Sequence, residues 1–171
     1  MSIKSLTIYC SSSNNLSINY YDLAEKLGKF LSDKHIQIIY GGGSVGLMGR
    51  VSSSAYNNGG LVKGIIPKFL VSKEKICNKT YETIIVKDII ERKKKLFEMG
   101  DAFLILPGGS GTIEEATEII SWKFLGLHNK EIIIFNFNNF WNPLIKMYEQ
   151  VKNKKFGNTN IQSIIKHIKT L

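Results

Sequence analysis

Short apolar segments rich in β-branched residues alternate with helix-like segments along this chain, and that alternation restricts the fold more than any other feature. The apolar segments cover residues 6–10, 36–40, 61–66, 81–86, 102–106 and 131–135. Most are continuously apolar, which is typical of strands covered on both faces. Helix-like segments cover residues 18–32, 46–57, 88–99, 112–126 and 140–153, and an amphipathic stretch over 161–171 closes the chain. We therefore predict a doubly wound, parallel α/β sheet of the Rossmann-like kind, formed by residues 1–171 as a single domain.

Composition excludes several classes of protein. The net charge is +9, but the lysines are scattered, and only Lys93–Lys95 form a run, so we expect no nucleic-acid partner. No apolar run approaches the roughly 18–20 residues of a membrane span, so we expect no membrane association. The two cysteines, Cys10 and Cys77, show no CxxC spacing and favour a reducing, cytoplasmic compartment. The three histidines show no metal-ligand spacing, and we predict no metal site.

Polar or glycine-rich segments directly follow three of the predicted strands. Residues 11–13 are serines, residues 41–43 are glycines, and residues 107–109 read Pro-Gly-Gly. Ligands of open α/β sheets bind at the carboxyl ends of the strands. These three loops are therefore predicted to line one pocket.

The segment GGGSVGLMGR (41–50) contains the pattern G-x-G-x-x-G at Gly41, Gly43 and Gly46. It follows a predicted strand and opens a predicted helix, as the dinucleotide-binding fingerprint requires. That fingerprint also needs a carboxylate about 20 residues further on, whereas no carboxylate lies between Asp33 and Glu74. The pattern therefore argues against a nicotinamide cofactor. It leaves two alternatives: Gly42 and Gly43 approach a phosphate, or the glycines only permit a tight turn.

The segment PGGSGTIEE (107–115) places glycines before a second predicted helix. Backbone N–H groups at such a helix start bind anions. Thr112 and Glu115 also match the capping box S/T-x-x-E, with Thr112 as the cap. Glu115 is therefore predicted either to cap the helix or to take part in chemistry beside an anion. The helix over 112–126 is apolar on more than one side, which predicts a homodimer that covers the second side.

Arg92 is one of only two arginines in the chain, and it falls on an apolar helix stripe. Ile89, Arg92, Leu96 and Met99 share that stripe. An arginine on an apolar face needs an anionic partner. That partner is a ligand or a structural ion pair, unless the side chain extends to solvent.

The segments GGGSVGLMG (41–49), ERK (91–93) and PGGSGTIEE (107–115), in this order, resemble the Lonely Guy family. The resemblance covers nearly the whole chain and implies a cytokinin nucleoside 5′-monophosphate phosphoribohydrolase. Such an enzyme cleaves the N-glycosidic bond of N6-substituted adenosine monophosphates to the free base and ribose 5-phosphate, without a cofactor. In bacterial relatives the activity extends to AMP. Many members are also labelled lysine decarboxylases, but this chain shows no pyridoxal-phosphate constellation.

The resemblance also implies roles for individual residues. Arg92 and Glu115 are expected to be catalytic. The expected substrate-binding residues are Gly42, Gly43, Glu74, Lys93, Gly108, Gly109, Ser110, Gly111, Thr112, Ile113, Glu114 and Ser121. The alternative is a non-catalytic carrier of a nucleotide or molybdopterin with the same fold and glycine loops. Such a carrier would not need the pair of Arg92 and Glu115.

Overall fold

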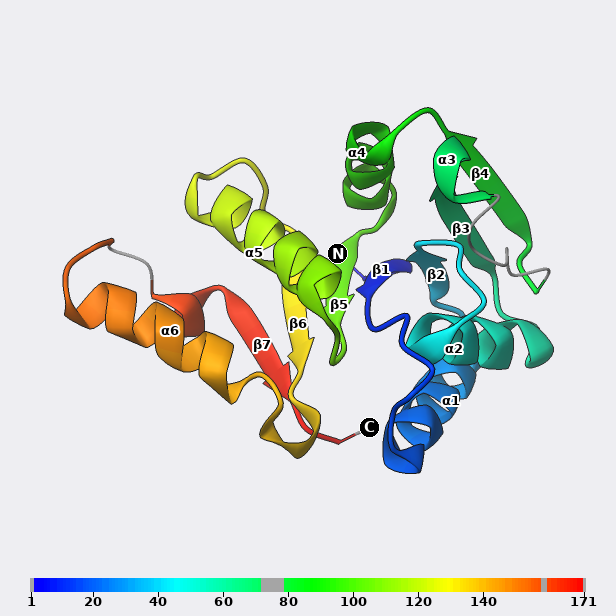
Figure 1. Cartoon of the computed structure of the whole chain (residues 1–171), viewed down its shortest axis with the longest axis horizontal. Helices are drawn as coiled ribbons and strands as arrows, with labels where there is room; N and C mark the ends of the chain where they lie inside the picture. The colour runs from blue at the N-terminus through cyan, green and yellow to red at the C-terminus, as the bar shows by residue number, and fades with distance from the viewer. Residues whose placement is uncertain (1, 72–78, 158–159, 171) are drawn as a thin grey trace.

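The computed structural model describes residues 2–71, 79–157 and 160–170. In these residues seven parallel strands form one sheet in the order β4-β3-β2-β1-β5-β6-β7 (Figure 1). The strands are β1 (Ser5–Tyr9), β2 (Gln37–Tyr40), β3 (Val62–Pro67), β4 (Glu82–Val86), β5 (Ala102–Ile105), β6 (Glu131–Phe135) and β7 (Ile165–Ile168). The predicted α/β fold and its six strands are confirmed. The seventh strand lies in the closing amphipathic stretch and pairs with β6, Ile165 opposite Ile132.

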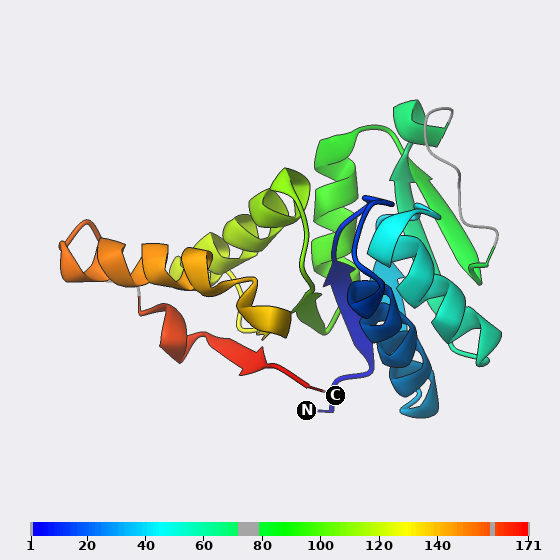
Figure 2. The same cartoon turned by 60° about the horizontal axis from the view of Figure 1, so that its bottom comes forward.

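Helices cover both faces of the sheet. The longer ones are α1 (Ile18–Asp33), α2 (Gly46–Asn57), α4 (Ile89–Met99), α5 (Ser110–Phe124) and α6 (Asn142–Asn153). The short ones are α3 (Lys68–Val71) and the 3-10 turns η1 (Phe137–Asn139) and η2 (Ile161–Ser163). Figures 1 and 2 show α1 beside α2, and α5 beside α6 along β6 and β7. No helix of the described ranges combines the length and the apolar character needed to cross a membrane.

Two buried cores lie on opposite faces of the sheet because successive strand residues point to opposite sides. Ile8, Ile38 and Leu104 pack with apolar residues of α1 and α2. Their chain neighbours Tyr9, Ile39 and Phe103 pack on the other side, with α4, α5 and α6. This burial on both faces explains why the interior strands have continuously apolar sequences.

The strand order reverses direction between β1 and β5. From β1 the chain proceeds through β2 and β3 to β4 at one edge, and from β5 through β6 to β7 at the other. In open α/β sheets, a crevice forms at such a reversal point, at the carboxyl ends of the strands. The loops after β1 and β5 therefore lie on either side of it.

The prediction that Thr112 caps α5 is wrong. The helix begins two residues earlier than expected, at Ser110, and its N-cap is Gly109, which has no side chain to make a capping hydrogen bond. Thr112 is buried within the first turn. The capping box is therefore not formed, and the capping interpretation of Glu115 loses its support.

The second apolar side of α5 is covered largely within the chain, not by a partner as the sequence suggested. Ile119 is buried. Trp122 packs edge-to-face against Phe97 of α4, with ring centroids 4.9 Å apart. The large apolar side chains that remain exposed lie near the two ends of α5. Ile113 in the first turn is 42% exposed, and Leu125, the residue after the last turn, is 71% exposed.

Candidate active site

A cavity of about 330 Å³ lies at the reversal point of the sheet. The loop after β1, the start of α5 with Glu115, and the side chains of Met48 from α2 and Arg92 from α4 form its walls. Its lining residues are Cys10, Ser11, Ser12, Ser13, Met48, Arg92, Gly109, Ser110, Gly111, Thr112 and Glu115. The predicted pocket is therefore present in part: the loops after the first and fifth strands line it, whereas residues 41–43, expected to line the same pocket, do not. The cavity contains both residues expected to be catalytic.

Hydrogen bonds fix the three loops against one another. The backbone N–H of Ser11 donates to Pro107 O at 3.1 Å, and the N–H of Leu47 donates to Ser11 O at 2.9 Å. The N–H of Gly46 donates to Asn14 Oδ1 at 2.9 Å. The walls are therefore preorganised, because the loop after β1 is bonded both to the loop after β5 and to the start of α2.

The glycines before and within the first turn of α5 have different roles. A Cβ at Gly108 would overlap the side chain of Thr112, so Gly108 is required for internal packing. A Cβ at Gly109 or Gly111 would meet nothing within 4 Å, and neither has a positive φ. Nothing within the described chain requires glycine at these two positions. We infer that their backbone is left bare for a ligand that approaches the free N–H groups of the first turn.

Changing Gly111 to Ala is expected to stabilise the fold and weaken ligand binding. Alanine is favoured over glycine within a helix by about 0.5–1 kcal/mol, and the added methyl group enters open space. The same methyl group would stand where a phosphate approaches, so the Kd for AMP should rise at least about tenfold. Urea denaturation and calorimetry measure the two effects. Unchanged AMP affinity would contradict a ligand at this turn.

Glu115 is partly buried in the wall of the cavity. Burial raises its pKa from the usual 4.5 to about 7, Arg92 and Lys93 act to lower it, and Glu114 and Glu118 act to raise it. Burial also raises the pKa of the neighbouring Cys10 thiol, which therefore stays neutral. Glu115 is thus a carboxyl group that can take up or release a proton near neutral pH.

Arg92 reaches the same cavity from α4. Its Nε is buried without a hydrogen-bond partner, and none of the ion pairs among the described residues involves Arg92. Gly41 makes room for the guanidinium, since a Cβ there would overlap Arg92 Nη2. Of the alternatives open for Arg92, a structural ion pair is therefore not observed in this part of the chain. A half-buried guanidinium at a cavity, with its Nε unpaired, favours an anionic ligand.

Of the residues expected to bind substrate, Gly109, Ser110, Gly111 and Thr112 line the cavity, and the remaining described ones lie outside its walls. Lys93 contacts Glu114 of α5, with 2.6 Å between Nζ and Oε1. Ile113 and Ser121 are exposed on α5. Gly42 has φ +82° and packs against Ile66, which supports the tight-turn alternative for that residue, and Gly43 is buried. Glu74 lies outside the described residues. The roles expected for these residues remain predictions.

Two lining residues, Cys10 and Met48, were not identified from the sequence. Cys10 ends the first apolar run and Met48 falls within the glycine motif of residues 41–50. The only sequence signal for a place in the cavity wall was that Cys10 precedes the serine loop and that Met48 lies among the glycines. Among the described residues, no group of three His, Cys, Asp or Glu side chains is placed to hold a metal ion.

A parallel sheet with a bare helix start, a half-buried arginine and an acidic side chain around one crevice is typical of the class of α/β proteins that bind phosphorylated ligands. A family model described as "Possible lysine decarboxylase" matches residues 48–171. The chain belongs to the Lonely Guy family, the family of the cytokinin riboside 5'-monophosphate phosphoribohydrolases. The family expected from the motifs is thereby confirmed.

Three relatives show the extent of this similarity. The "Probable cytokinin riboside 5'-monophosphate phosphoribohydrolase LOGL6" of Oryza sativa subsp. japonica is 39% identical over 94% of the chain, which spans 64% of that relative's length. The phosphoribohydrolase LOG4 of Arabidopsis thaliana is 38% identical over 94% of the chain and 74% of its own length. The phosphoribohydrolase of Rhodococcoides fascians is 39% identical over 85% of the chain and 74% of its own length.

Solved structures share the fold at lower sequence identity. The molybdenum cofactor carrier protein of Chlamydomonas reinhardtii superposes with a TM-score of 0.71 at 15% identity, covering 97% of this chain and 89% of its own. The molybdenum cofactor binding protein of Rippkaea orientalis superposes with a TM-score of 0.62 at 18% identity, over 78% and 77%. At these identities the likeness demonstrates the fold alone.

Proposed function

We propose that this chain hydrolyses the N-glycosidic bond of nucleoside 5′-monophosphates, both N6-substituted adenosine monophosphates and AMP, to free base and ribose 5-phosphate. The domain of residues 1–171 would carry this activity in the cytoplasm without a cofactor. The names of the relatives support the reaction. The observation that carries it is the placement of Arg92 and Glu115 on the same cavity as the bare first turn of α5.

The first turn of α5 suits the 5′-phosphate. Its free N–H groups and the positive end of the helix dipole attract a dianion. The open space at Gly109 and Gly111 lets phosphate oxygens approach the backbone. Arg92 supplies a permanent positive charge in the same cavity, with donors in a planar fork that matches phosphate oxygens.

Glu115 suits the ribose. As the C1′–N bond breaks, its electron pair leaves with the base and positive charge develops on the ribose ring, as in glycoside hydrolysis. The ionised Glu115 stabilises that charge or accepts a proton from the attacking water. The water oxygen bonds to C1′, the other product is the free base, and the base takes up one proton. The turn thus binds the negative charge of the phosphate, and the carboxylate stabilises the positive charge that develops on the ribose.

Incubation of the protein with AMP and with isopentenyladenosine monophosphate tests this proposal. Chromatography should show adenine and isopentenyladenine, each released together with an equal amount of ribose 5-phosphate. If both nucleotides bind but neither is cleaved, the non-catalytic carrier becomes the better interpretation. Release of inorganic phosphate in place of base would assign a different reaction.

We also propose a homodimer with two-fold symmetry. Ile89 and Ile90 at the start of α4 are 43% and 75% exposed, and Ile113 on α5 is 42% exposed. The contact of Lys93 with Glu114 brings these ends of the two helices together. Three exposed isoleucines at one end of the molecule therefore favour a partner surface there.

Light scattering should give twice the 19.3 kDa mass of the chain. Ile90→Glu should convert the protein to monomers, because it places a charge in the proposed interface. Met147→Glu is the matched control, because Met147 is 60% exposed on α6, away from this end. A 19.3 kDa species for the unmodified chain at micromolar concentration would rule the dimer out.

A further inference from the structure

Lys93 bridges two carboxylates of the neighbouring helix. Its Nζ lies 2.6 Å from Glu114 Oε1 and 2.6 Å from Glu118 Oε1. The two glutamates are one turn apart on α5, so one ammonium group can bond both. The side chains of Lys93 and Glu118 are only 22% and 23% exposed, so solvent screens this bridge less than an ordinary surface pair.

The bridge lies beside both residues proposed to be catalytic. Lys93 follows Arg92 on α4, and Glu114 precedes Glu115 on α5. Arg92 and Glu115 line the cavity, whereas Lys93, Glu114 and Glu118 do not. The two helices thus present one pair of residues to the cavity and join through the adjacent pair.

A second contact holds the same helices further along. Phe97, one turn after Lys93, packs against Trp122, with centroids 4.9 Å apart. The aromatic contact fixes the helices away from the cavity and the charged bridge fixes them beside it. Loss of the bridge would free the cavity end of α4 while the aromatic contact preserves the fold.

The bridge also sets the charges that face Glu115. Arg92 and Lys93 contribute positive charge from α4, and Glu114 and Glu118 contribute negative charge from α5 itself. Tyr9 and Cys10, at the end of β1, are buried, and burial raises the pKa of both, so they are neutral. Without Lys93, two uncompensated carboxylates would flank Glu115.

We propose that Lys93 is a positioning residue that ties α4 to α5 through Glu114 and Glu118, and so fixes Arg92 and Glu115 across the cavity. This inference rests on the proposed hydrolysis and replaces the substrate contact expected for Lys93. Two of the three donors of its ammonium are already engaged with carboxylates. The anion of the substrate is left to Arg92 and the helix start.

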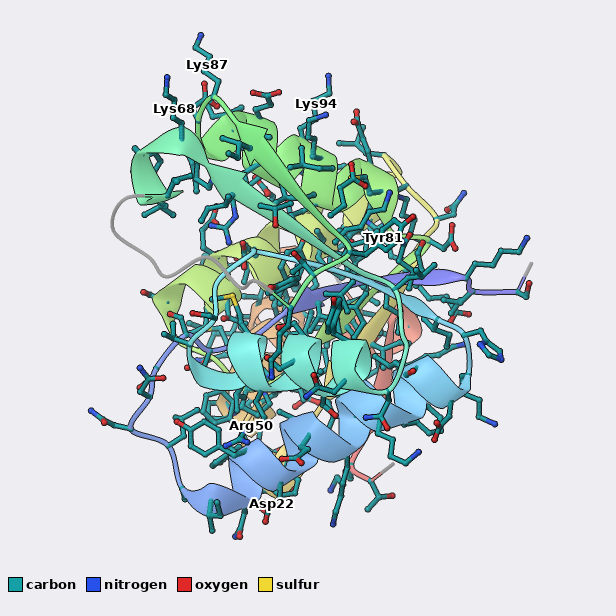
Figure 3. The ribbon with its side chains drawn as sticks, turned by 90° about the vertical axis from the view of Figure 1, so that its right-hand side faces the viewer. Asp22, Arg50, Lys68, Tyr81, Lys87 and Lys94 are labelled. Carbon is teal, nitrogen blue, oxygen red and sulfur yellow. The ribbon has the colours of Figure 1, made fainter. Side chains whose placement is uncertain are left out.

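Three variants separate positioning from substrate contact. Lys93→Met keeps an unbranched side chain of nearly the same length and removes the bridge. The double variant Glu114→Gln, Glu118→Gln removes the bridge while Lys93 stays. Lys94→Met is the control, since Lys94 is the next lysine on α4, is 70% exposed and points outward (Figure 3).

The measurements are the ¹³C NMR titration of the Glu115 carboxyl, the Kd for AMP by calorimetry, and kcat for AMP. Lys93→Met should move the Glu115 titration upward, and the double variant should move it downward, each by at least about half a pH unit. Both variants should lower kcat about tenfold, because either one releases the helices, and both should leave the Kd for AMP within about threefold. Lys94→Met should change none of these quantities.

Two results would overturn the assignment. If Lys93→Met raises the Kd for AMP more than about tenfold while the double variant does not, Lys93 contacts the substrate directly. If neither variant moves the Glu115 titration, the bridge is a surface contact. Failure of the proposed hydrolysis is a separate outcome, recognised by the absence of base release from the unmodified protein. In that case the titration and the calorimetry still test the bridge.

Discussion

Replacing Glu115 with Gln should lower kcat for AMP by roughly 10²–10³, the usual consequence of losing one preorganised electrostatic group. Glutamine keeps the size of the side chain and removes the charge that would stabilise the ribosyl cation. The Kd for AMP should stay similar or fall, because one carboxylate near the phosphate is gone. Single-turnover kinetics and calorimetry measure the two quantities separately.

Glu114→Gln is the matched comparison for this variant. Glu114 occupies the same region of α5 and contributes the same kind of dipole interaction, but it lies outside the cavity walls. Lys93 would keep Glu118 as a partner. We expect kcat within about threefold of the unmodified protein. If both substitutions change kcat by the same small factor, Glu115 has no catalytic role.

Glu115 should also make stability depend on pH. Its pKa in the folded protein, about 7, lies above the usual 4.5, so the folded state binds the proton more tightly than the unfolded chain. The ionised carboxyl therefore destabilises the fold above pH 7, by about 3 kcal/mol, and most of this cost disappears by pH 5. Glu115→Gln should thus be more stable than the unmodified protein at pH 8 and nearly equal to it at pH 5, by urea denaturation.

The same titration predicts the pH dependence of the reaction. If the ionised Glu115 is needed, kcat/KM should rise with pH up to about 7 and then level off, since the profile of kcat/KM reports groups of the free enzyme. In Glu115→Gln this rise should be absent. Activity that falls as pH passes 7 would instead assign Glu115 as the acid that protonates the base.

The interior of the sheet was predictable because its signals are local. Continuous apolar runs identify strands buried on both faces, and helical spacing between them is visible without knowledge of the tertiary structure. Strand β7 was not identified because it lies at the edge of the sheet. Ile165 is buried while Lys166 is exposed, so this short segment has an amphipathic pattern that does not distinguish strand from helix.

The start of α5 shows a limit of motif matching. Thr112 and Glu115 have capping-box spacing, yet Gly109 is the cap. The same spacing at Asp88 and Glu91 does form a cap: Asp88 Oδ1 accepts from Glu91 N at 2.9 Å, and Glu91 Oε2 accepts from Lys87 N at 2.8 Å. The spacing alone could not separate the two sites, because the difference depends on where the preceding strand ends.

The loops around the cavity could be predicted, but the contacts between helices could not. Parallel strands bring their carboxyl ends to one edge, so the loops after β1 and β5 could be assigned to one pocket, although residues 41–43, assigned to it as well, do not line it. The pairing of Lys93 with Glu114 and Glu118 depends on the distance between α4 and α5, which no local pattern encodes. For the same reason the sequence could not reveal that Gly41 makes room for Arg92.

Replacing Arg92 with Lys should lower kcat/KM for AMP by about 10²-fold or more, although the positive charge is kept. Lysine offers a point charge on a flexible stem, whereas the guanidinium offers donors in one plane. The cavity already fixes that plane, because Gly41 leaves room for Nη2 and Nε is buried. Steady-state kinetics give the ratio, and turnover within about twofold would mean that Arg92 contributes only general electrostatics.

Gly41→Ala tests the same position without changing the charge or the chemistry of Arg92. The new methyl group would overlap Nη2, so the guanidinium must move away, while the fold should survive because the end of a long side chain can shift. If orientation is what matters, Gly41→Ala should reproduce much of the loss seen in Arg92→Lys. Combining the two changes should then cost less than the product of the separate losses, because both act through one guanidinium. Full activity in Gly41→Ala would show that Arg92 needs no fixed orientation. The role of Gly41 would then be limited to the tight turn of the glycine-rich loop.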